Sequence, residues 1–219
     1  MNKVCYSPPH NFGLDLVYQD NSILLINKPA GLLSVPGRGA DKQDCLSGRV
    51  QEEFPDALIV HRLDMATSGL IVFARGTEIQ RRLSQSFQDR KVEKRYVAVV
   101  KGKPGTDMGE VNLPIIADWP NRPKQKIDTT IGKYSLTRYR LLNYDMEVDT
   151  SRIELEPITG RTHQLRIHMA AIGHPILGDK LYGGAVSESA ERLLLHAHSL
   201  KFMHPLNEIA MSWICGSAF

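Results

Sequence analysis

Hydrophobic residues along this chain fall into short runs and alternations that are separated by turn residues. Leu14 to Tyr18 and Ser22 to Ile26 lie on either side of Gln19-Asp20-Asn21, and together they predict a β-hairpin. A continuous apolar run from Gly69 to Ala74 predicts a buried strand. Arg95 to Val100 is rich in β-branched residues, which favour a strand.

Two helices are predicted in the first half of the chain. Cys45 to Phe54 predicts a short helix that ends before Pro55, because the residue before a proline disfavours helical backbone angles. Thr77-Glu78-Ile79-Gln80 has the pattern of a capping box and predicts the start of a second helix. Apolar residues then recur along that helix at four-residue spacing, at Ile79, Leu83 and Phe87.

The second half of the chain predicts more strands than helices. Leu136 to Asn143, Met146 to Asp149 and Arg152 to Pro157 are separated by turn residues, and we expect them to form an antiparallel meander. Residues 103–135 are rich in Pro, Gly, Asp and Lys, and they predict no more than short strands around Val111 to Ile115.

A third helix is predicted at Gly160 to Ile172. Thr162 is the expected N-cap, and Gly173 suits the position after the last helical turn. A strand at Leu193 to Phe202 is expected to follow. The apolar face of the predicted helix consists of Leu165, His168, Met169 and Ile172.

Runs of strands between single helices favour an α+β fold over a doubly wound sheet. The 219 residues are enough for one well-buried domain or for two small ones. We expect residues 1–13, which contain Pro8, Pro9 and Gly13, to be a short N-terminal lead, and residues 14–219 to form a single domain.

The charge of the chain is nearly balanced, with 27 Lys and Arg against 24 Asp and Glu, so an extended polybasic tail is absent. Positive charge is nevertheless clustered. Nine Lys or Arg and three acidic residues lie between Arg75 and Lys103. Arg122, Lys124 and Lys126 stand in a stretch that has no acid from Trp119 to Lys126. A solvated helix face and a phosphate-binding rim explain these clusters equally well from composition alone.

Cys5, Cys45 and Cys215 are odd in number and far apart, which fits neither a disulfide framework nor a zinc site and predicts reduced thiols. His196 and His198 would project to the same side of a strand, but they have no acidic or cysteine neighbour, so we expect no metal. No apolar run approaches the roughly 20 residues of a membrane helix. These features favour a cytoplasmic protein with no membrane partner.

Five polar residues crowd into eight positions between the apolar runs 57–60 and 69–74. They are His61, Arg62, Asp64, Thr67 and Ser68. A loop between two strands would present them in a cleft. The simpler alternative is that Asp64 pairs with Arg62 or caps a turn.

Residues 61–70 resemble the signature H-R-L-D-x-x-T-S-G-L of the RluA family of RNA pseudouridine synthases. Two further blocks of that family resemble Arg95 to Gly102 and Gly160 to His168, in the same order. Shorter matches at Asn27 to Gly31 and Gly178 to Gly183 extend the resemblance over most of residues 14–205. The chain departs from the signature at Met65-Ala66, which affects contacts local to those positions.

The resemblance implies a pseudouridine synthase fold of the α+β class, with a mixed and mostly antiparallel central sheet, flanking helices and a catalytic cleft. It also implies isomerisation of uridine to pseudouridine within RNA, which needs no cofactor. In that reaction Asp64 would act on the sugar, Arg166 would keep Asp64 ionised, and Tyr96 would pack on the uracil and move the last proton. The residues do not decide whether Asp64 attacks C1′ or removes the C2′ proton.

The same resemblance implies that the target uridine is flipped out of its stack, with Arg62 filling the gap or binding phosphate. His61 and Thr67 would hold the loop at this RNA contact, and Arg161 and Lys28 would be further RNA-binding residues, although Lys28 also suits a solvated loop. The expected partners are ribosomal and transfer RNA stem-loops, with no obligatory protein partner. A metal-independent RNA hydrolase that uses His61 or His163 with Asp64, and an RNA-binding module without catalysis, are the competing hypotheses.

Overall fold

The computed structural model describes residues 6–219, which divide into two compact units. The first unit contains residues 6–93 and Ala197–Gly216, and the second contains Lys94–His196 and Ser217–Phe219. Strands β5 (Glu93–Lys101) and β11 (Leu195–Met203) each begin in one unit and end in the other. Residues 1–5, and with them Cys5 and the start of the predicted N-terminal lead, lie outside the described residues.

The first unit is built on an antiparallel sheet in the order β1-β2-β4-β11. β3 also pairs with β4, and β12 pairs with β11, both in antiparallel register. The predicted hairpin and the predicted buried strand of this unit are confirmed. Apart from β11, the strands are β1 (Leu16–Gln19), β2 (Ile23–Lys28), β3 (Ala57–Ile59), β4 (Ser68–Arg75) and β12 (Ala210–Ile214).

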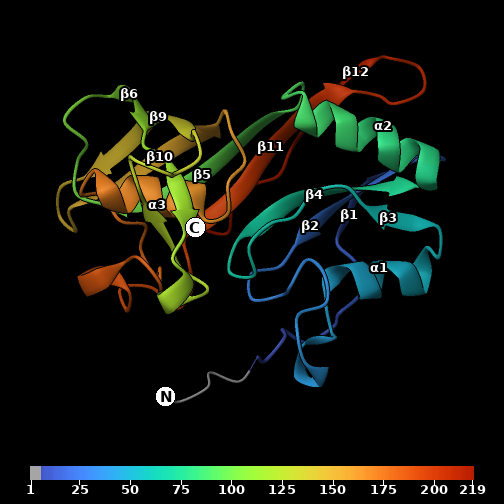
Figure 1. Ribbon diagram of the computed structural model, residues 1–219, viewed down its shortest axis with the longest axis horizontal. Coiled ribbons are helices and arrows are strands. Elements are labelled where there is room, and N and C mark those ends of the chain that lie inside the picture. Colours follow the sequence, from blue (N-terminus) through green and yellow to red (C-terminus); the bar gives the residue numbers. More distant parts are fainter. Residues whose placement is uncertain (1–5) are drawn as a thin grey trace. The chain divides into compact units, whose positions relative to one another are not determined.

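Both faces of β2 and β4 are covered, which explains why β4 reads as a continuous apolar run. Helix α2 (Thr77–Gln88) packs against β4, and α1 (Leu46–Glu53) packs against β3 (Figure 1). Ile79 and Leu83 of α2 join the core on one face of the strands. The side chains that point to the opposite face are equally buried, namely Leu24, Ile26, Ile71 and Phe73.

Both helices lie close to their predicted positions, but the start of α2 differs from the prediction. Its N-cap is Gly76, whose φ of 82° is left-handed, and no side chain caps the helix. The predicted capping box at Thr77 is therefore wrong, because Thr77 already stands inside the first turn. Glycine suits this position because it tolerates a positive φ without steric cost.

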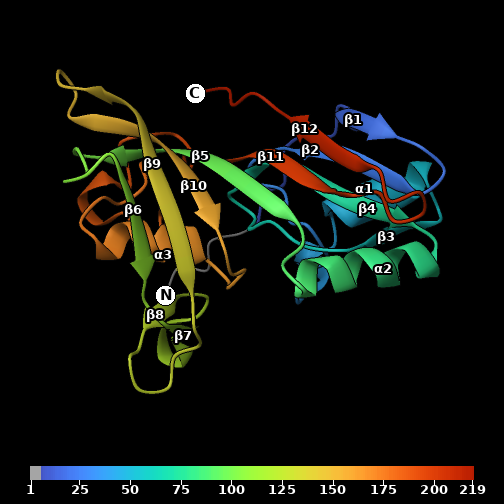
Figure 2. The same ribbon diagram turned by 90° about the horizontal axis from the view of Figure 1, so that it is seen from above.

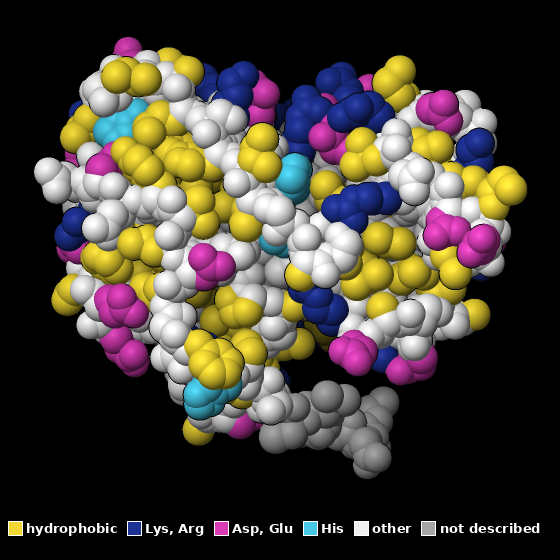
Figure 3. Space-filling view, turned by 180° about the vertical axis from the view of Figure 1, so that it is seen from behind, with side chains coloured by type: hydrophobic (Ala, Val, Ile, Leu, Met, Phe, Trp, Pro, Cys, Tyr) yellow, Lys and Arg dark blue, Asp and Glu magenta, His cyan; other side chains and the backbone are white. Residues whose placement is uncertain are grey.

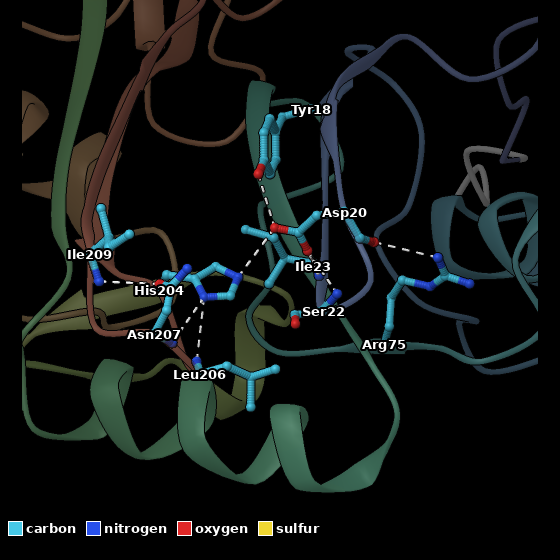
Figure 4. Close-up of polar contacts among 9 residues, drawn as sticks. All are labelled: Tyr18, Asp20, Ser22, Ile23, Arg75, His204, Leu206, Asn207 and Ile209. Carbon is cyan, nitrogen blue, oxygen red and sulfur yellow. Dashed lines mark hydrogen bonds and ion pairs between the residues drawn. The ribbon is translucent and has the colours of Figure 1, made fainter.

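Asp20 organises the turn between β1 and β2 (Figure 4). Its carboxylate accepts hydrogen bonds from the backbone N–H groups of Ser22 and Ile23 at 2.7 and 2.8 Å, and from the Tyr18 hydroxyl at 2.9 Å. The buried His204 ring, just after β11, meets the same carboxylate at 3.2 Å. Burial acts to raise the pKa of Asp20, but these donors outweigh it and the pKa is lowered.

The second unit has its own antiparallel arrangement, in the order β5-β10-β9-β6. The strands that join β5 are β6 (Met108–Asn112), β9 (Leu136–Asp145) and β10 (Thr150–Pro157). The predicted strand at Met146 to Asp149 is wrong. These residues form the turn between β9 and β10, where Asp149 has a φ of 51°. The α+β class and the largely antiparallel sheet are confirmed.

Helix α3 (Gln164–Ala171) is shorter than predicted. Its N-cap is His163, which has a left-handed φ of 55°, so the prediction of Thr162 as N-cap is wrong. The other end agrees with the prediction. The N–H of Gly173 donates to the carbonyl of Ala170, and the N–H of His174 donates to that of Met169, which is a Schellman arrangement.

A small hairpin of β7 (Ile115–Ala117) and β8 (Gln125–Ile127) lies beyond the ends of β6 and β9 in the second unit (Figure 2). The sequence pattern indicated short strands in this region without fixing them. Within residues 6–219, no helix is both long and apolar enough to cross a membrane.

Candidate active site

The loop between β3 and β4 carries the signature residues, and its backbone is held on the N-terminal side of Asp64 by Ser34. The Ser34 hydroxyl donates to the carbonyl of Leu63 at 2.7 Å and accepts from the N–H of the same residue at 3.2 Å. Both residues are buried. One side chain thus satisfies both backbone groups of the residue before Asp64, which fixes the two peptide planes on either side of Leu63.

The residue after Asp64 is held as firmly. The carbonyl of Met65 accepts the N–H of Gly31 at 2.8 Å and the ammonium of Lys28 at 3.1 Å. Thr67, which is buried, closes the turn through its own N–H, which donates to the carbonyl of Asp64 at 3.1 Å. The flanking peptides are therefore set by hydrogen bonds, and the side chain of Asp64 is presented from a fixed frame.

Lys28 does not occupy a solvated loop. It is the last residue of β2 and is fully buried, and its ammonium also donates to the carbonyls of Pro29 at 2.8 Å and Leu32 at 2.7 Å. The expectation of a solvent-exposed lysine at the mouth of the loop is wrong for this reason. A buried ammonium with carbonyl partners supports the loop instead of reaching outward to phosphate.

His61 also supports the loop between β3 and β4. Its Nε2 accepts the N–H of Val72 at 3.1 Å, and its ring stacks on Phe87 of α2 with centroids 4.4 Å apart. A ring nitrogen that accepts a backbone N–H has no proton at that atom. These two contacts support the expected role of His61 in holding the loop. They connect the loop to both β4 and α2.

Arg62 and Asp64 differ in exposure although they are only two residues apart. The side chain of Arg62 is exposed, whereas Asp64 is half-buried and Leu63 between them is buried. This alternation matches the expectation that Arg62 points away from the frame that holds Asp64.

Gly69, at the start of β4, has a φ of 113° and lies against the backbone of Ala197. A Cβ at this position would stand 2.4 Å from the carbonyl oxygen of Ala197. Only glycine fits such an approach. The end of the signature loop is therefore fixed by packing against Ala197, the first residue of β11 that belongs to the first unit.

In the second unit, Arg166 on α3 is paired with Asp179. Its Nε and Nη2 donate to the two carboxylate oxygens at 2.8 and 2.6 Å. Asp179 also accepts the N–H groups of Leu181 and Tyr182 at 2.9 and 3.1 Å. Burial acts to raise the pKa of Asp179, but the arginine and these N–H groups outweigh it, so the pKa is lowered and the carboxylate is charged.

The ring of Tyr182 lies beside that pair, with the guanidinium carbon of Arg166 5.3 Å from its centroid. The Tyr182 hydroxyl meets His163 Nδ1 at 2.8 Å and accepts the N–H of Gln125 at 2.7 Å. The Tyr182 hydroxyl thus links His163 to the start of β8. Arg166 is thus oriented by one carboxylate and one aromatic ring.

The sequence reasoning assigned no role to Ser34, Asp179 or Tyr182. Asp179 and Tyr182 stand in the segment Gly178 to Gly183, which was matched to the family, and that match was the available signal. Ser34 has no local signal, since its partner is 29 residues away.

Tyr96 and Arg161 also lie in the second unit. Tyr96 is the fourth residue of β5, opposite Leu155 of β10, and is half-buried. Arg161 is exposed, and its Nε donates to the carbonyl of Tyr134 at 3.3 Å, which leaves other guanidinium N–H groups for an RNA contact.

Histidines and acids of the described residues form no cluster of three or more ligands that could hold a metal ion. His198, one of the two histidines considered for metal binding, donates from Nδ1 to the carbonyl of Cys215 at 2.7 Å. This places it in the packing of β11 and the chain end.

Comparison with known proteins adds independent support. Residues 22–171 match the model of a family described as RNA pseudouridylate synthase. The dual-specificity RNA pseudouridine synthase RluA of Escherichia coli K12 is 50% identical over 201 residues, which cover 91% of each protein. The protein of the same name from Haemophilus influenzae is 46% identical over 215 residues, which cover 98% of each.

A solved structure titled human RNA pseudouridylate synthase domain containing 1 superposes with a TM-score of 0.80 at 27% identity, and covers 97% of this chain and 87% of the human one. A second structure, titled human RNA pseudouridylate synthase domain containing 4, gives a TM-score of 0.72 at 25% identity. It covers 92% of this chain and 87% of the human one. Fold, motifs and overall similarity agree. The chain belongs to the RNA pseudouridylate synthase family and is an RNA pseudouridine synthase, an isomerase.

Proposed function

We propose that this enzyme converts specific uridines to pseudouridine in structured RNA, in stem-loops of large-subunit ribosomal RNA and of transfer RNA. The observation that carries the proposal is the frame around Asp64, in which Ser34, Gly31 and Lys28 fix the peptides on both sides. The names of the bacterial relatives, which describe dual specificity, support two classes of RNA substrate.

The reaction breaks the bond from N1 of uracil to C1′ of ribose and forms a bond from C5 to C1′. The C5 hydrogen leaves and a solvent proton ends on N1, so the substrate and product have the same mass. No electrons are gained or lost, and no group is added, so we expect no cofactor and no metal. Asp64 acts on the sugar either by attack on C1′ or by removal of the C2′ proton.

Tyr96 and Arg166 would act on the same uridine. Arg166 would favour the ionised form of Asp64, since a nearby cation lowers a carboxyl pKa. Its own orientation comes from Asp179 and the Tyr182 ring. Tyr96 would stack on the uracil and pass the last proton through its hydroxyl.

A stacked uridine must leave its helix or loop stack to be modified, which costs a few kcal/mol. Arg62 is suited to fill the gap that remains, because its planar guanidinium is exposed two residues from Asp64 and stacks well on bases. Arg161 would bind phosphate. His61 and Thr67 would contribute by holding the loop that presents Arg62.

The decisive experiment uses stem-loop RNA with tritium on C5 of uridine. We expect label to appear in water in proportion to pseudouridine formed, with the strand intact and its mass unchanged. A methyltransferase would add mass, and the hydrolase that uses His61 or His163 would cut or shorten the RNA. Asp64→Asn should reduce release below one per cent of wild type and change RNA affinity no more than a few fold. Release at the wild-type rate would remove Asp64 from the chemistry.

We further propose that the two units work as one catalytic domain over residues 14–219, in the cytoplasm and without a protein partner. The purified chain in EDTA should then modify RNA at its full rate. An activity that depended on an added protein or on zinc would contradict this.

A further inference from the structure

The β7–β8 hairpin carries an exposed tryptophan that the proposed chemistry does not use. Trp119 is 67% exposed, and the guanidinium carbon of Arg122 lies 3.1 Å from the ring centroid. Lys124 and Lys126 follow, and no acid stands between Trp119 and Ile127. We call Trp119, Arg122, Lys124 and Lys126 the hairpin surface. It combines an open aromatic face with three cations, of which Lys126 pairs with Asp128 at 3.3 Å.

The backbone of the hairpin surface is ordered before any ligand binds. The N–H of Asp118 donates to the carbonyl of Lys124, and the N–H of Lys124 donates to the carbonyl of Asn121, each at 3.0 Å. Asn121 also donates from its side chain to Asp118 at 2.9 Å, which occupies one oxygen of the acid that precedes Trp119. A ligand would therefore lose little free energy in ordering this loop.

The hairpin surface also connects to the arginine of the site within the same unit. The N–H of Gln125, the first residue of β8, donates to the Tyr182 hydroxyl at 2.7 Å, and the Tyr182 ring lies against Arg166. The position of β8 is thus tied to a residue that orients Arg166. A nucleotide on the hairpin would belong to the RNA segment that enters the site.

Three arginines on the sheet of the second unit are less suited to RNA. A cavity of about 380 Å³ on the sheet is lined by Arg95, Arg138 and Arg140, but Glu154 and Glu110 pair with them at 2.7 to 3.1 Å. Figure 3 shows Lys and Arg side chains scattered over the face that it draws, some of them beside Asp and Glu. Because those charges are already compensated, they would attract phosphate weakly.

We propose that the hairpin surface binds unpaired nucleotides of the RNA next to the target uridine. One base stacks on the open face of Trp119, while Arg122 and Lys124 contact phosphate. Single-stranded RNA is recognised in this way, because every base offers a flat face and every linkage a negative charge. This inference rests on the proposed function, since it assumes that RNA is the substrate.

Binding of a stem-loop substrate to Trp119→Ala and to Lys124→Gln tests the proposal. Trp119→Ala should weaken RNA affinity roughly tenfold, within the range measured for loss of one stacked base, and should leave the salt dependence unchanged. Trp119→Phe should restore most of the loss. Lys124→Gln should instead reduce the slope of log affinity against log salt by about 0.7, the value for one phosphate of a single strand.

Met146→Ala and Lys103→Gln are the matched controls, because both residues are exposed in the same unit away from the hairpin. Neither should change affinity or salt slope. Wild-type affinity of Trp119→Ala, or a loss of the same size in Met146→Ala, would overturn the inference. Wild-type enzyme that released no tritium from any RNA would instead overturn the proposed function, so the two failures are distinguishable.

Discussion

Arg166 and Asp179 hold each other through two parallel hydrogen bonds, with side chains that are 5% and 1% exposed. Such a pair fixes the plane of the guanidinium as well as its position, because both carboxylate oxygens are used. Asp179 is fixed in turn by the N–H groups of Leu181 and Tyr182. The arginine therefore presents a set orientation to whatever it contacts.

Replacing Asp179 by Asn should lower both stability and turnover. The buried Arg166 would lose its counter-charge, which costs about 3–5 kcal/mol in comparable pairs. For a chain of this size the melting temperature should fall by roughly 10 °C. Turnover at 20 °C, where the variant is still folded, should fall more than RNA affinity does.

Asp149→Asn is the matched control, since its carboxylate pairs with Lys101 at 3.1 Å and is half exposed. That variant should lose much less stability than Asp179→Asn, because an exposed ion pair contributes little. An Asp179→Asn protein with wild-type turnover at 20 °C would show that the pair is structural and does not position Arg166 for chemistry.

Lys28→Met tests whether the buried lysine serves the loop or the RNA. Methionine fills similar space but gives no donor to the carbonyl of Met65, which follows Asp64. Turnover should fall between roughly tenfold and a hundredfold, as expected for a misplaced catalytic group. RNA affinity and its salt slope should match those of wild type. If the slope of log affinity against log salt were reduced in Lys28→Met but not in Lys103→Met, Lys28 would be a phosphate contact instead.

His61→Phe separates support from acid–base chemistry. The new ring retains the stack on Phe87 but leaves the N–H of Val72 without its acceptor. Stability should fall by about 1–3 kcal/mol, the cost of an unsatisfied buried donor. The pH dependence of turnover, measured without denaturant, should have the same shape as that of wild type. Loss of a titration step from that profile would show that His61 moves protons.

The buried His168 predicts a pH dependence of stability. Its Nε2 donates to the carbonyl of Leu113, and its Nδ1 meets the Thr137 hydroxyl, both at 2.9 Å. Burial lowers its pKa from the ordinary value of about 6.5, against a smaller raising effect of the Leu113 bond. The unfolded chain therefore binds the proton more readily than the folded chain does.

Stability should consequently decrease as the pH falls below about 6.5, by up to about 1.4 kcal/mol per pH unit, until the lowered native pKa is passed. Urea unfolding at pH 5.0, 6.0 and 7.5 measures this slope. His168→Gln should be less stable at pH 7.5 and should lose part of the slope. The lowered pKa of Asp179 acts in the same direction but at lower pH, below 3.8. A wild-type slope in the variant would assign the effect to another histidine.

Local patterns predicted the elements well where one principle dominated. The buried run of β4 and the four-residue spacing in α2 both came directly from side-chain periodicity. Helix starts were predicted less well. Thr77 and Thr162 have the composition of N-caps, but Gly76 and His163 take those places because the chain enters each helix through a left-handed residue. Such a residue leaves little trace in the polarity pattern.

The site was predictable as a set of residues and not as a set of contacts. The signature string identified Asp64 and its neighbours because they are adjacent in sequence. Lys28 was placed wrongly because it donates to the backbone carbonyls of Pro29, Leu32 and Met65, and every residue possesses such a carbonyl. Asp179 was missed as the partner of Arg166 for a related reason, since a pairing over 13 residues across a turn depends on the fold.

The paired bonds between Ser34 and Leu63 have a consequence for how the loop opens. The amide proton of Leu63 is held by a buried hydroxyl that donates its own proton to the carbonyl of the same residue, so movement of Leu63 away from Ser34 breaks both bonds. Exchange of that proton with solvent water then requires Leu63 to move away from Ser34, which lies in the loop between β2 and α1. Although Leu63 lies in a loop, its amide proton should exchange as slowly as those of the core, and Asp64 beside it should be equally rigid.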